Sequence, residues 1–278
     1  MRYKPDAMGK KILITTVSLN ASGVAYLSDG AKKLGLDVEA IEYTRDSDSV
    51  LSMIRNSDYT FFRMAPVSLN RYAELNESLR SETLRNMLRA FDKYEAFLEL
   101  ERNGIATPRT CLVIGDVLPK GFDYPVVLKV ACGNQGNGVE LVRNKEESVV
   151  LKELREMGDK VICQEYIETA KGSDKRLIAV DGIVVAAMRR MAVQGNFKAN
   201  LHQGGIAEVY NPSEKEIDMA VRATECLGLD FAGVDIVDGN DGPLILEVNP
   251  SPGFKISEIV GFDVPELIIN RLIERRKI

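Results

Sequence analysis

The N-terminal part of the chain alternates between short apolar runs and amphipathic stretches. Three runs have the apolar, β-branched character of strands, and two stretches between them repeat their apolar positions at helical spacing. The strand patterns cover residues 11–17, 38–43 and 59–64, and the helical patterns cover residues 24–34 and 47–55. Strands that alternate with helices are typical of a small parallel sheet. We therefore expect an α/β domain of βαβαβ type over residues 9–88, preceded by a disordered leader over residues 1–8.

The pattern changes after this domain, because strands become more frequent than helices. Residues 81–103 predict one or two helices, with Asp92 and Glu95 as the capping residues of the second. Five further strands are expected at residues 110–114, 126–130, 161–167, 176–180 and 183–189, and three helices at residues 146–157, 214–227 and 264–276. This order indicates an α+β domain over residues 89–278.

Two strand patterns near the C-terminus are separated by a turn-rich segment, which indicates a hairpin. They cover residues 231–237 and 243–249. If the hairpin pairs symmetrically about Asp241, then Asp235 lies opposite Glu247. Asn249 then projects from the same face, opposite Gly233, because side chains alternate along a strand.

This face of the hairpin carries three oxygen ligands. Hard divalent cations prefer carboxylate and carbonyl oxygens, and Mg²⁺ completes its shell with water and phosphate oxygens. Asp235, Glu247 and Asn249 therefore predict a magnesium site. Solvated polar positions on an amphipathic hairpin would show the same spacing, so the spacing alone leaves both interpretations open.

A lysine and a glycine-rich loop follow each other in the middle of the chain. Lys129 ends an apolar strand pattern, and a buried ammonium needs an anionic partner because an unpaired one is costly. The loop at residues 133–139 lets backbone N–H groups approach phosphate oxygens closely. It matches neither the Walker pattern nor the dinucleotide fingerprint, and an ordinary hairpin loop is the alternative.

Three further polar segments carry weaker signals. Asp174 lies in a polar turn, where an acidic side chain can accept hydrogen bonds from ribose hydroxyls; an ordinary edge strand and turn is the alternative. Arg189 and Arg190 point to opposite faces if they lie in a strand, so only one of them can join a site, unless both are a solvated basic pair. His202 lies in an irregular loop and is interpreted as a hydrogen-bonded structural residue rather than a base.

Composition excludes several classes of function. The 278 residues carry a net charge of −5, which argues against general nucleic-acid binding because phosphate neutralisation needs a basic face. Four widely spaced cysteines and a single histidine argue against a disulfide framework, a zinc site and a Ser/His triad. No apolar run approaches the roughly 18 residues of a membrane-spanning helix. We expect a cytoplasmic homo-oligomer without a membrane partner.

The order of these motifs resembles that of the ATP-grasp ligases: a lysine strand, a glycine-rich loop, a Gln-Glu-Tyr linker, an aspartate, an arginine pair, and an Asp followed by Glu-x-Asn. Within that superfamily the chain is similar to the RimK-type glutamate ligases. The matching blocks are residues 164–167, 172–174, 200–205, 232–236 and 247–253. The resemblance covers roughly residues 88–275, and the preceding βαβ segment fits the N-terminal domain of the family.

The resemblance implies an ATP-grasp fold, in which two α+β subdomains clasp ATP and a lid subdomain spans about residues 112–167. It also implies ATP and two Mg²⁺ or Mn²⁺ ions as cofactors. The expected nucleotide contacts are Lys93 and Lys129 at the phosphates, Glu165 and Tyr166 at the adenine, Asp174 at the ribose, and Lys198 and Asn200 at the polyphosphate. The expected metal ligands are Asp235, Glu247 and Asn249.

The chemistry of the family needs no nucleophilic side chain. ATP phosphorylates a substrate carboxylate, and an amine attacks the acyl phosphate to form an amide. Catalysis is then positioning and charge stabilisation. Arg190 is the expected catalytic residue, at the transferring phosphoryl group or the tetrahedral oxyanion, and residues 251–253 would shape the acceptor pocket.

The resemblance implies a ligase that adds L-glutamate to the carboxylate of a protein tail, a peptide or a coenzyme. Two positions depart from the pattern of the family: Lys198 stands where an arginine is common, and Gln203 replaces a basic residue. The lost cation weakens the case for a strongly acidic acceptor. The alternatives are an ATP-grasp ligase for another amino acid and a non-catalytic ATP-binding regulator. The intact metal set and Arg190 argue against the regulator.

Overall fold

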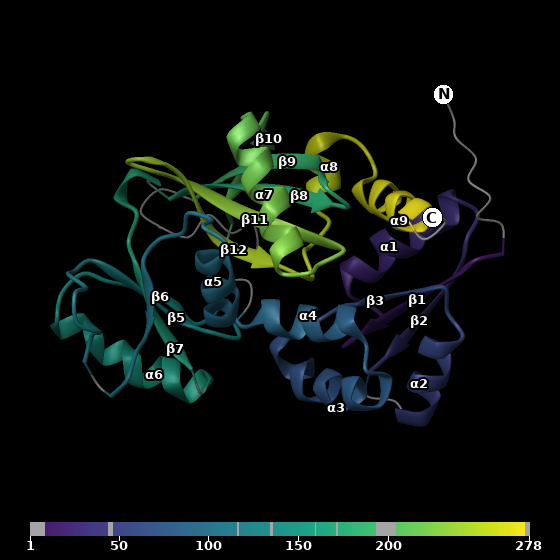
Figure 1. The fold of residues 1–278 in the computed structure, drawn as a ribbon, viewed down its shortest axis with the longest axis horizontal. Coiled ribbons are helices and arrows are strands. Elements are labelled where there is room, and N and C mark those ends of the chain that lie inside the picture. The colour runs from purple at the N-terminus through teal and green to yellow at the C-terminus, as the bar shows by residue number, and fades with distance from the viewer. Residues whose placement is uncertain are drawn as a thin grey trace.

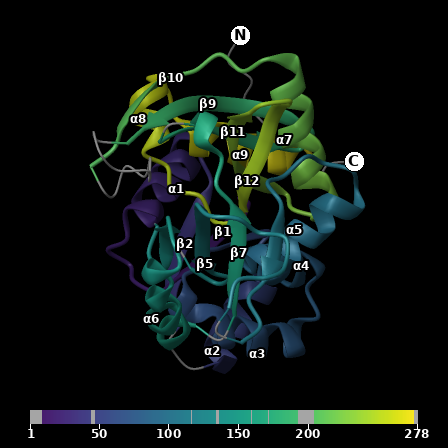
Figure 2. The ribbon, with the colours of Figure 1, turned by 90° about the vertical axis from the view of Figure 1, so that its left-hand side faces the viewer.

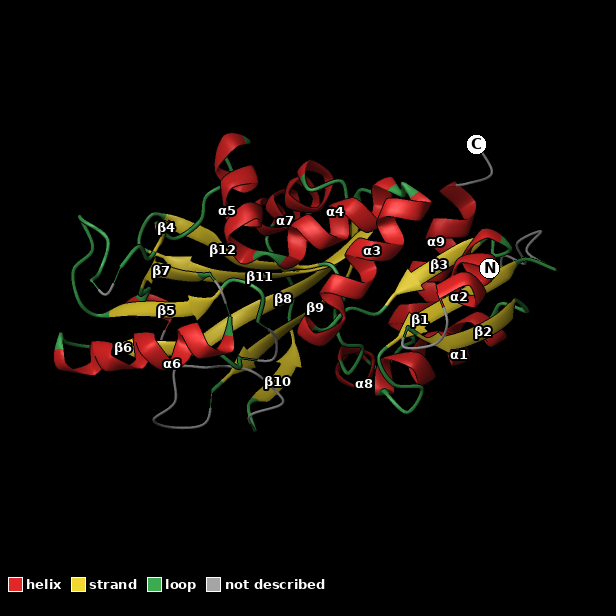
Figure 3. Ribbon diagram, turned by 90° about the horizontal axis from the view of Figure 1, so that it is seen from below, coloured by secondary structure: helices red, strands yellow, loops and turns green. Residues whose placement is uncertain are grey.

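The computed structural model describes residues 9–43, 47–115, 117–133, 136–158, 160–170, 172–192 and 204–275. Within these residues the chain forms three sheets, which follow one another along the long axis of the molecule (Figures 1 and 3). None of the described helices is both long enough and apolar enough to cross a membrane.

The N-terminal sheet is parallel, as the alternation of strands and helices predicted. Its strand order is β2-β1-β3. The strands are β1 (Lys11–Thr16), β2 (Asp37–Glu42) and β3 (Tyr59–Phe62), and the helices of this region are α1 (Ser22–Lys33), α2 (Ser47–Arg55) and α3 (Leu69–Leu79). Helix α3 was not predicted, although Leu69, Tyr72, Leu75 and Leu79 recur at helical spacing.

A four-stranded antiparallel sheet lies at the opposite end of the molecule (Figure 1). Its order is β4-β7-β5-β6, with β4 (Thr110–Leu112), β5 (Val126–Val130), β6 (Val139–Val142) and β7 (Val161–Glu165). On β5, Val126 and Leu128 pack with helix α6 (Val150–Met157) in a separate hydrophobic core. Val127 and Lys129 line a cavity instead. The alternation of one strand thus gives one face to the core and the other to a site.

The five-stranded sheet is antiparallel and lies above the four-stranded sheet in Figures 1 and 2. Its order is β10-β9-β8-β11-β12, with β8 (Ser173–Val180), β9 (Ile183–Met191), β10 (Ile206–Val209), β11 (Phe231–Gly239) and β12 (Gly242–Asn249). The remaining helices are α4 (Glu82–Phe91), α5 (Lys93–Arg102), α7 (Glu214–Cys226), α8 (Ile256–Val260) and α9 (Val264–Arg275). The short elements β6, β10 and α8 were not predicted, because each spans only four or five residues and shows no clear period.

The N-terminal sheet and the five-stranded sheet share two hydrophobic cores. Leu13 of β1 belongs to the same core as Leu177 of β8, with α4, α5 and α7 on that side. Ile14 and Ile178, the next residue of each strand, belong to the other core, with α1, α8 and α9. The ends of the N-terminal strands are therefore held in place relative to the five-stranded sheet, whereas the four-stranded sheet has its own core.

Candidate active site

A cavity of about 390 Å³ lies where the three sheets meet. Its walls come from strands of the four-stranded and five-stranded sheets, from the ends of β1 and β3, and from the start of α1. The sequence-predicted site residues that line it are Lys93, Lys129, Glu165, Tyr166, Asp174, Arg190, Asp235, Glu247 and Asn249. Lys198 and Asn200 lie outside the described residues, as do His202 and Gln203.

Lys93 enters the cavity from the first turn of α5. Asp92 caps this helix, as predicted, by accepting hydrogen bonds from the backbone N–H groups of Tyr94 and Glu95. The Lys93 ammonium donates to the backbone oxygen of Gly133 at 2.6 Å and lies 3.4 Å from Glu247 Oε1. It thereby joins the glycine-rich loop to the C-terminal hairpin.

The sequence predicted an anionic partner for Lys129, but the structure shows a neutral one. Its Nζ donates to the neutral Oε1 of Gln164 at 2.6 Å, and no carboxylate in the described part of the chain forms an ion pair with it. Burial lowers the pKa of Lys129 to about 8, because the charge of Glu247 compensates for only part of the lost solvation. A desolvated ammonium without a carboxylate partner is suited to bind phosphate oxygens.

Glu165 and Tyr166 line the cavity at the end of β7. The backbone N–H of Glu165 donates to the backbone oxygen of Arg109 at 2.9 Å, which holds this end of the strand beside the segment before β4. The Glu165 side chain is exposed and Tyr166 is half-buried. Such a strand end can present both backbone groups and a ring to a flat ligand.

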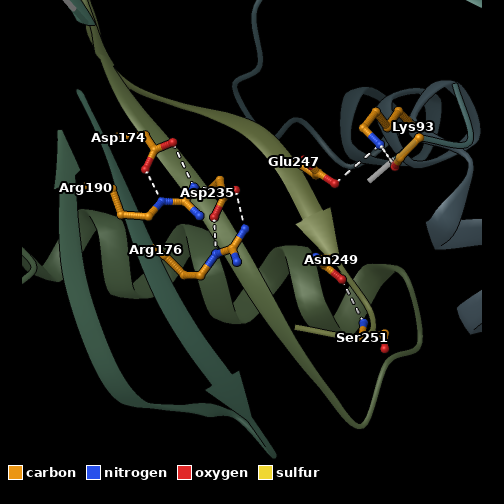
Figure 4. A network of polar contacts seen from close by, with 9 residues as sticks. Lys93, Asp174, Arg176, Arg190, Asp235, Glu247, Asn249 and Ser251 are labelled. Carbon is orange, nitrogen blue, oxygen red and sulfur yellow. Dashed lines mark hydrogen bonds and ion pairs between the residues drawn. The ribbon is translucent and has the colours of Figure 1, made fainter. Parts of the chain in front are cut away.

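A network of two aspartates and two arginines forms the central wall of the cavity (Figure 4). Strand register explains it, because Asp174 lies opposite Arg190, and Arg176 lies opposite Asp235. Arg190 donates to both oxygens of Asp174, at 2.6 and 2.8 Å, and Arg176 donates to both oxygens of Asp235, at 2.7 Å. Arg190 Nη2 also reaches Asp235 Oδ2 at 2.8 Å, so the four charges form one unit.

Burial and pairing compete in this network. Burial opposes ionisation of Asp235, but the charges of Arg176 and Arg190 outweigh it and lower the pKa of Asp235 to about 2. Burial raises the pKa of Asp174 against the attraction of Arg190. Although burial works against it, the two carboxylates raise the pKa of Arg190, which therefore stays charged. Arg189 lies on the opposite face, as the alternation predicted, with its guanidinium 5.8 Å from the ring centre of Tyr210.

The predicted metal ligands lie on the β11–β12 hairpin. The register pairs Asp235 with Glu247 and Gly233 with Asn249, which confirms the expected arrangement at this end. Symmetry about Asp241 is wrong for the rest of the hairpin. A bulge at Leu246 shifts the register there by one residue, so that Gly239 pairs with Gly242 across a two-residue turn.

The three side chains engage different partners in the structure (Figure 4). Asp235 is held by the arginines, Glu247 faces Lys93, and Asn249 Oδ1 accepts a hydrogen bond from the backbone of Ser251 at 2.8 Å. Among the described residues no three carboxylate, histidine or cysteine side chains converge as a metal cage. The donor set still fits Mg²⁺ or Mn²⁺, because such ions bind to few protein oxygens and are completed by nucleotide phosphates.

Two arginines of the cavity wall were missed in the sequence. Arg176 follows Asp174 by two residues in one strand, so the strand period was the signal that would have found it. Arg63 comes directly after β3. Its only signal was its place at the carboxyl end of a parallel strand, where ligand sites of open α/β sheets occur.

Comparison with known proteins assigns the chain to a family. A family model described as RimK-like ATP-grasp domain matches residues 90–272. The chain belongs to the RimK-like ATP-grasp family. A relative from Enterobacter sp. (strain 638) is named "Probable alpha-L-glutamate ligase". It is 36% identical to this chain over 230 residues, which are 80% of this chain and 75% of the relative.

Solved structures share the fold of this RimK-like protein. D-alanine–D-alanine ligase from Bacillus anthracis, complexed with ATP, superposes with a TM-score of 0.71 over 98% of this chain and 99% of its own, at 19% identity. A RimK domain ATP-grasp protein from Sphaerobacter thermophilus gives a TM-score of 0.70 over 94% and 98%, at 20% identity. The family and the fold confirm the predicted class, an ATP-grasp ligase that forms carbon–nitrogen bonds with ATP hydrolysis.

Proposed function

We propose that this ATP-grasp ligase adds L-glutamate to a carboxylate of a protein tail, a peptide or a coenzyme. The observation that carries the proposal is that one cavity brings two lysines, an Asp-Glu-Asn set and Arg190 together. Cations for phosphates, oxygen ligands for a divalent ion and an arginine for developing negative charge are the parts that carboxylate activation needs. The name of the Enterobacter relative supports glutamate as the amino acid.

In this proposal, the nucleotide occupies the end of the cavity that lies between the four-stranded and five-stranded sheets. The proposed contacts are Lys93, Lys129, Lys198 and Asn200 for the phosphates, Glu165 and Tyr166 for the adenine, and Asp174 for the ribose. The proposed ligands of two Mg²⁺ or Mn²⁺ ions are Asp235, Glu247 and Asn249. No carboxylate among the residues that the structure describes pairs with Lys129, which supports a phosphate there. When bound, the metal ions neutralise phosphate charge.

The reaction then follows from the positions of these residues. An oxygen of the substrate carboxylate attacks the γ-phosphorus, and ADP leaves. The amine attacks the resulting acyl phosphate, inorganic phosphate leaves, and the amine nitrogen loses a proton. Lys93 and Lys129 hold the phosphates for the first step, and Arg190, which stays charged, stabilises the negative charge that develops.

The four-stranded sheet would exclude water from the acyl phosphate. Its separate core supports our proposal that about residues 112–167 form a lid subdomain of an ATP-grasp domain at residues 89–278. Closure of such a lid protects a reactive intermediate from hydrolysis. Residues 9–88 would form the N-terminal domain after a leader at residues 1–8.

Acceptor-dependent release of ADP tests the proposed function. The purified chain is incubated with ATP, Mg²⁺, single amino acids and candidate carboxylates. ADP is measured, and the products are identified from their masses by mass spectrometry. We expect ADP release that needs both L-glutamate and a carboxylate acceptor, with an amide product. If ADP release depends on a different amino acid and not on L-glutamate, that amino acid takes the place of L-glutamate in the proposal. Nucleotide binding without any acceptor-dependent ADP would contradict the proposal and favour a regulator.

A further inference from the structure

The cavity continues beyond the proposed nucleotide and metal residues to the N-terminal sheet. There it is lined by the ends of β1 and β3, the first turn of α1 and the segment after β12. The charge of the walls differs between the two ends. All four lining carboxylates, Glu165, Asp174, Asp235 and Glu247, belong to the nucleotide end, whereas the described residues up to 65 contribute Arg63 and no carboxylate.

The Arg63 guanidinium has neither a carboxylate nor another hydrogen-bond acceptor in the described part of the chain. Its guanidinium lies 5.1 Å from the ring centre of Phe254 and donates no hydrogen bond to a described residue, and its Nη1 atom is fully buried. Burial lowers the pKa of Arg63 to about 10, and no described carboxylate counteracts the effect. A desolvated guanidinium without an acceptor is costly, so this position is suited to an anion that comes from outside the chain.

The first turn of α1 adds to the same positive region. A Cβ atom at Gly23 would lie 2.9 Å from Arg63 Nη2, so a larger residue here would push the guanidinium away. The backbone N–H groups of Ser22 and Gly23 have no acceptor among the described residues, and this turn contains no acidic side chain. The N-terminal end of a helix attracts anions, and here it faces the same guanidinium.

A short series of contacts sets the position of Arg63 relative to the proposed metal ligand Asn249. The backbone N–H of Ser251 donates to Asn249 Oδ1 at 2.8 Å, and the Ser251 hydroxyl accepts a hydrogen bond from the backbone N–H of Met64 at 3.1 Å. Met64 directly follows Arg63, and Phe254 packs against the guanidinium. The cation is thus held at a defined place beside the reaction centre.

We propose that Arg63, with the first turn of α1, binds a substrate carboxylate that does not react. This inference rests on the proposed function. The reacting carboxylate must lie beside the phosphates and Arg190, so the anion at Arg63 is a second one. L-Glutamate keeps its α-carboxylate when its amine attacks, and an acceptor that ends in glutamate also has a carboxylate to spare. A guanidinium fork fits either of them bidentately, which makes Arg63 a residue that determines substrate specificity.

Calorimetric titration of the full chain, saturated with a non-hydrolysable ATP analogue and Mg²⁺, tests this inference. The ligands are L-glutamate, a glutamyl-glutamate dipeptide, and the α-amide of each. We expect the wild-type protein to bind one of the acids at least about tenfold more tightly than its amide, about 1.4 kcal/mol. Arg63→Met should remove that preference. The acid whose preference is lost, L-glutamate or the dipeptide, is the substrate that Arg63 binds. Arg102→Met, at an arginine that is 67% exposed, is the matched control and should keep it.

Two outcomes would overturn the inference. One is a wild-type protein that does not distinguish acid from amide for either ligand, and the other is an Arg63→Met protein that keeps the wild-type preference. Because the readout is binding, either result leaves the ligase proposal standing if ADP release is observed. Carboxylate binding at Arg63 without ADP release would refute the proposed turnover but not the site.

Gly23→Ala provides a second variant that keeps the charge of Arg63. The new Cβ displaces the guanidinium, so we expect the preference for the acid to fall at least about threefold. Alanine also favours helix formation more than glycine, and Arg63→Met removes a half-buried cation that has no carboxylate partner in the described part of the chain, so Tm should be unchanged or higher in both variants. A lower Tm in both, with the preference unaltered, would mean that Arg63 is purely structural and would contradict the inference.

Discussion

The two ends of the cavity hold their cations in different ways. At the nucleotide end, Lys93, Arg176 and Arg190 each lie within ion-pair distance of a carboxylate. Among the described residues, Lys129 has only a neutral amide as its hydrogen-bond partner, and at the N-terminal end Arg63 has the ring of Phe254 but no carboxylate. Paired charges are oriented before any ligand arrives, whereas the unpaired cations need an anionic ligand to complete their environment.

Because of this difference, substitutions at paired and unpaired cations should affect stability and ligand binding differently. Removing one partner of a buried ion pair leaves the other charge uncompensated, so it should destabilise the fold as well as the reaction. Removing an unpaired buried cation relieves a desolvation penalty and should impair only ligand binding. Substitutions at the two kinds of position therefore test whether the cavity is divided as described.

The largest effect is expected at Glu247, which faces Lys93 and is a proposed metal ligand. Glu247→Ala should lower acceptor-dependent ADP release at least about 100-fold, because the ligand set loses a carboxylate. The rate is measured while Mg²⁺ and Mn²⁺ are titrated, and chelation should abolish it in the wild type. Glu101→Ala, at an exposed carboxylate on α5, is the control and should keep the wild-type rate. Full activity in Glu247→Ala would refute the metal assignment.

The neighbouring arginines Arg189 and Arg190 provide a matched pair on opposite faces of β9. Arg190→Lys keeps a charge but loses the fork that binds Asp174 and reaches Asp235, so kcat should fall about 100-fold while KM for ATP changes little. Arg189→Lys should leave kcat within about threefold, because its side chain lies over Tyr210, away from the cavity. Steady-state kinetics give kcat and KM for both variants. Equal losses of kcat in the two variants would contradict a catalytic role that is specific to Arg190.

An intermediate effect is expected for Lys129, whose pKa is lowered to about 8. The ammonium is charged below this pKa and neutral above it, and only the charged form attracts phosphate. The Kd for ATP should therefore rise about tenfold between pH 7 and pH 9 in the wild-type protein. Lys129→Arg keeps its charge over this range and should show a flat profile. A wild-type Kd that does not change with pH would argue against a phosphate contact at Lys129.

The smallest effect is expected at Ser251, which connects Asn249 with the strand end that carries Arg63. Ser251→Ala loses one hydrogen bond, so the free energy of unfolding should fall by about 1 kcal/mol. The affinity for the substrate carboxylate should fall about twofold to threefold. Ser257→Ala loses a comparable bond, from the N–H of Val264, outside the cavity. Denaturant unfolding should show similar losses in both variants, but only Ser251→Ala should weaken carboxylate binding.

Much of the candidate site was predictable because its geometry is local. Asp235 and Glu247 belong to one hairpin, and the spacing of a hairpin and the alternation of a strand place them opposite each other. The opposite directions of Arg189 and Arg190 follow from the same alternation. Asp92 caps α5 because its side chain bonds to groups two and three residues away. The predicted symmetric pairing about Asp241 was wrong between Leu246 and the turn, because a bulge depends on packing as well as on spacing.

The sequence by itself determined the order of most elements, the fold class and most of the charged residues that line the nucleotide end, although not Arg176, because these depend on local period and on motif order. Only the tertiary structure decided which charges are paired. Arg176 meets Asp235, Lys129 meets Gln164, and Arg63 meets no described carboxylate because segments far apart in the chain are brought to one cavity. The electrostatic environment of a side chain depends on its neighbours in space, and spacing along the chain does not specify those neighbours.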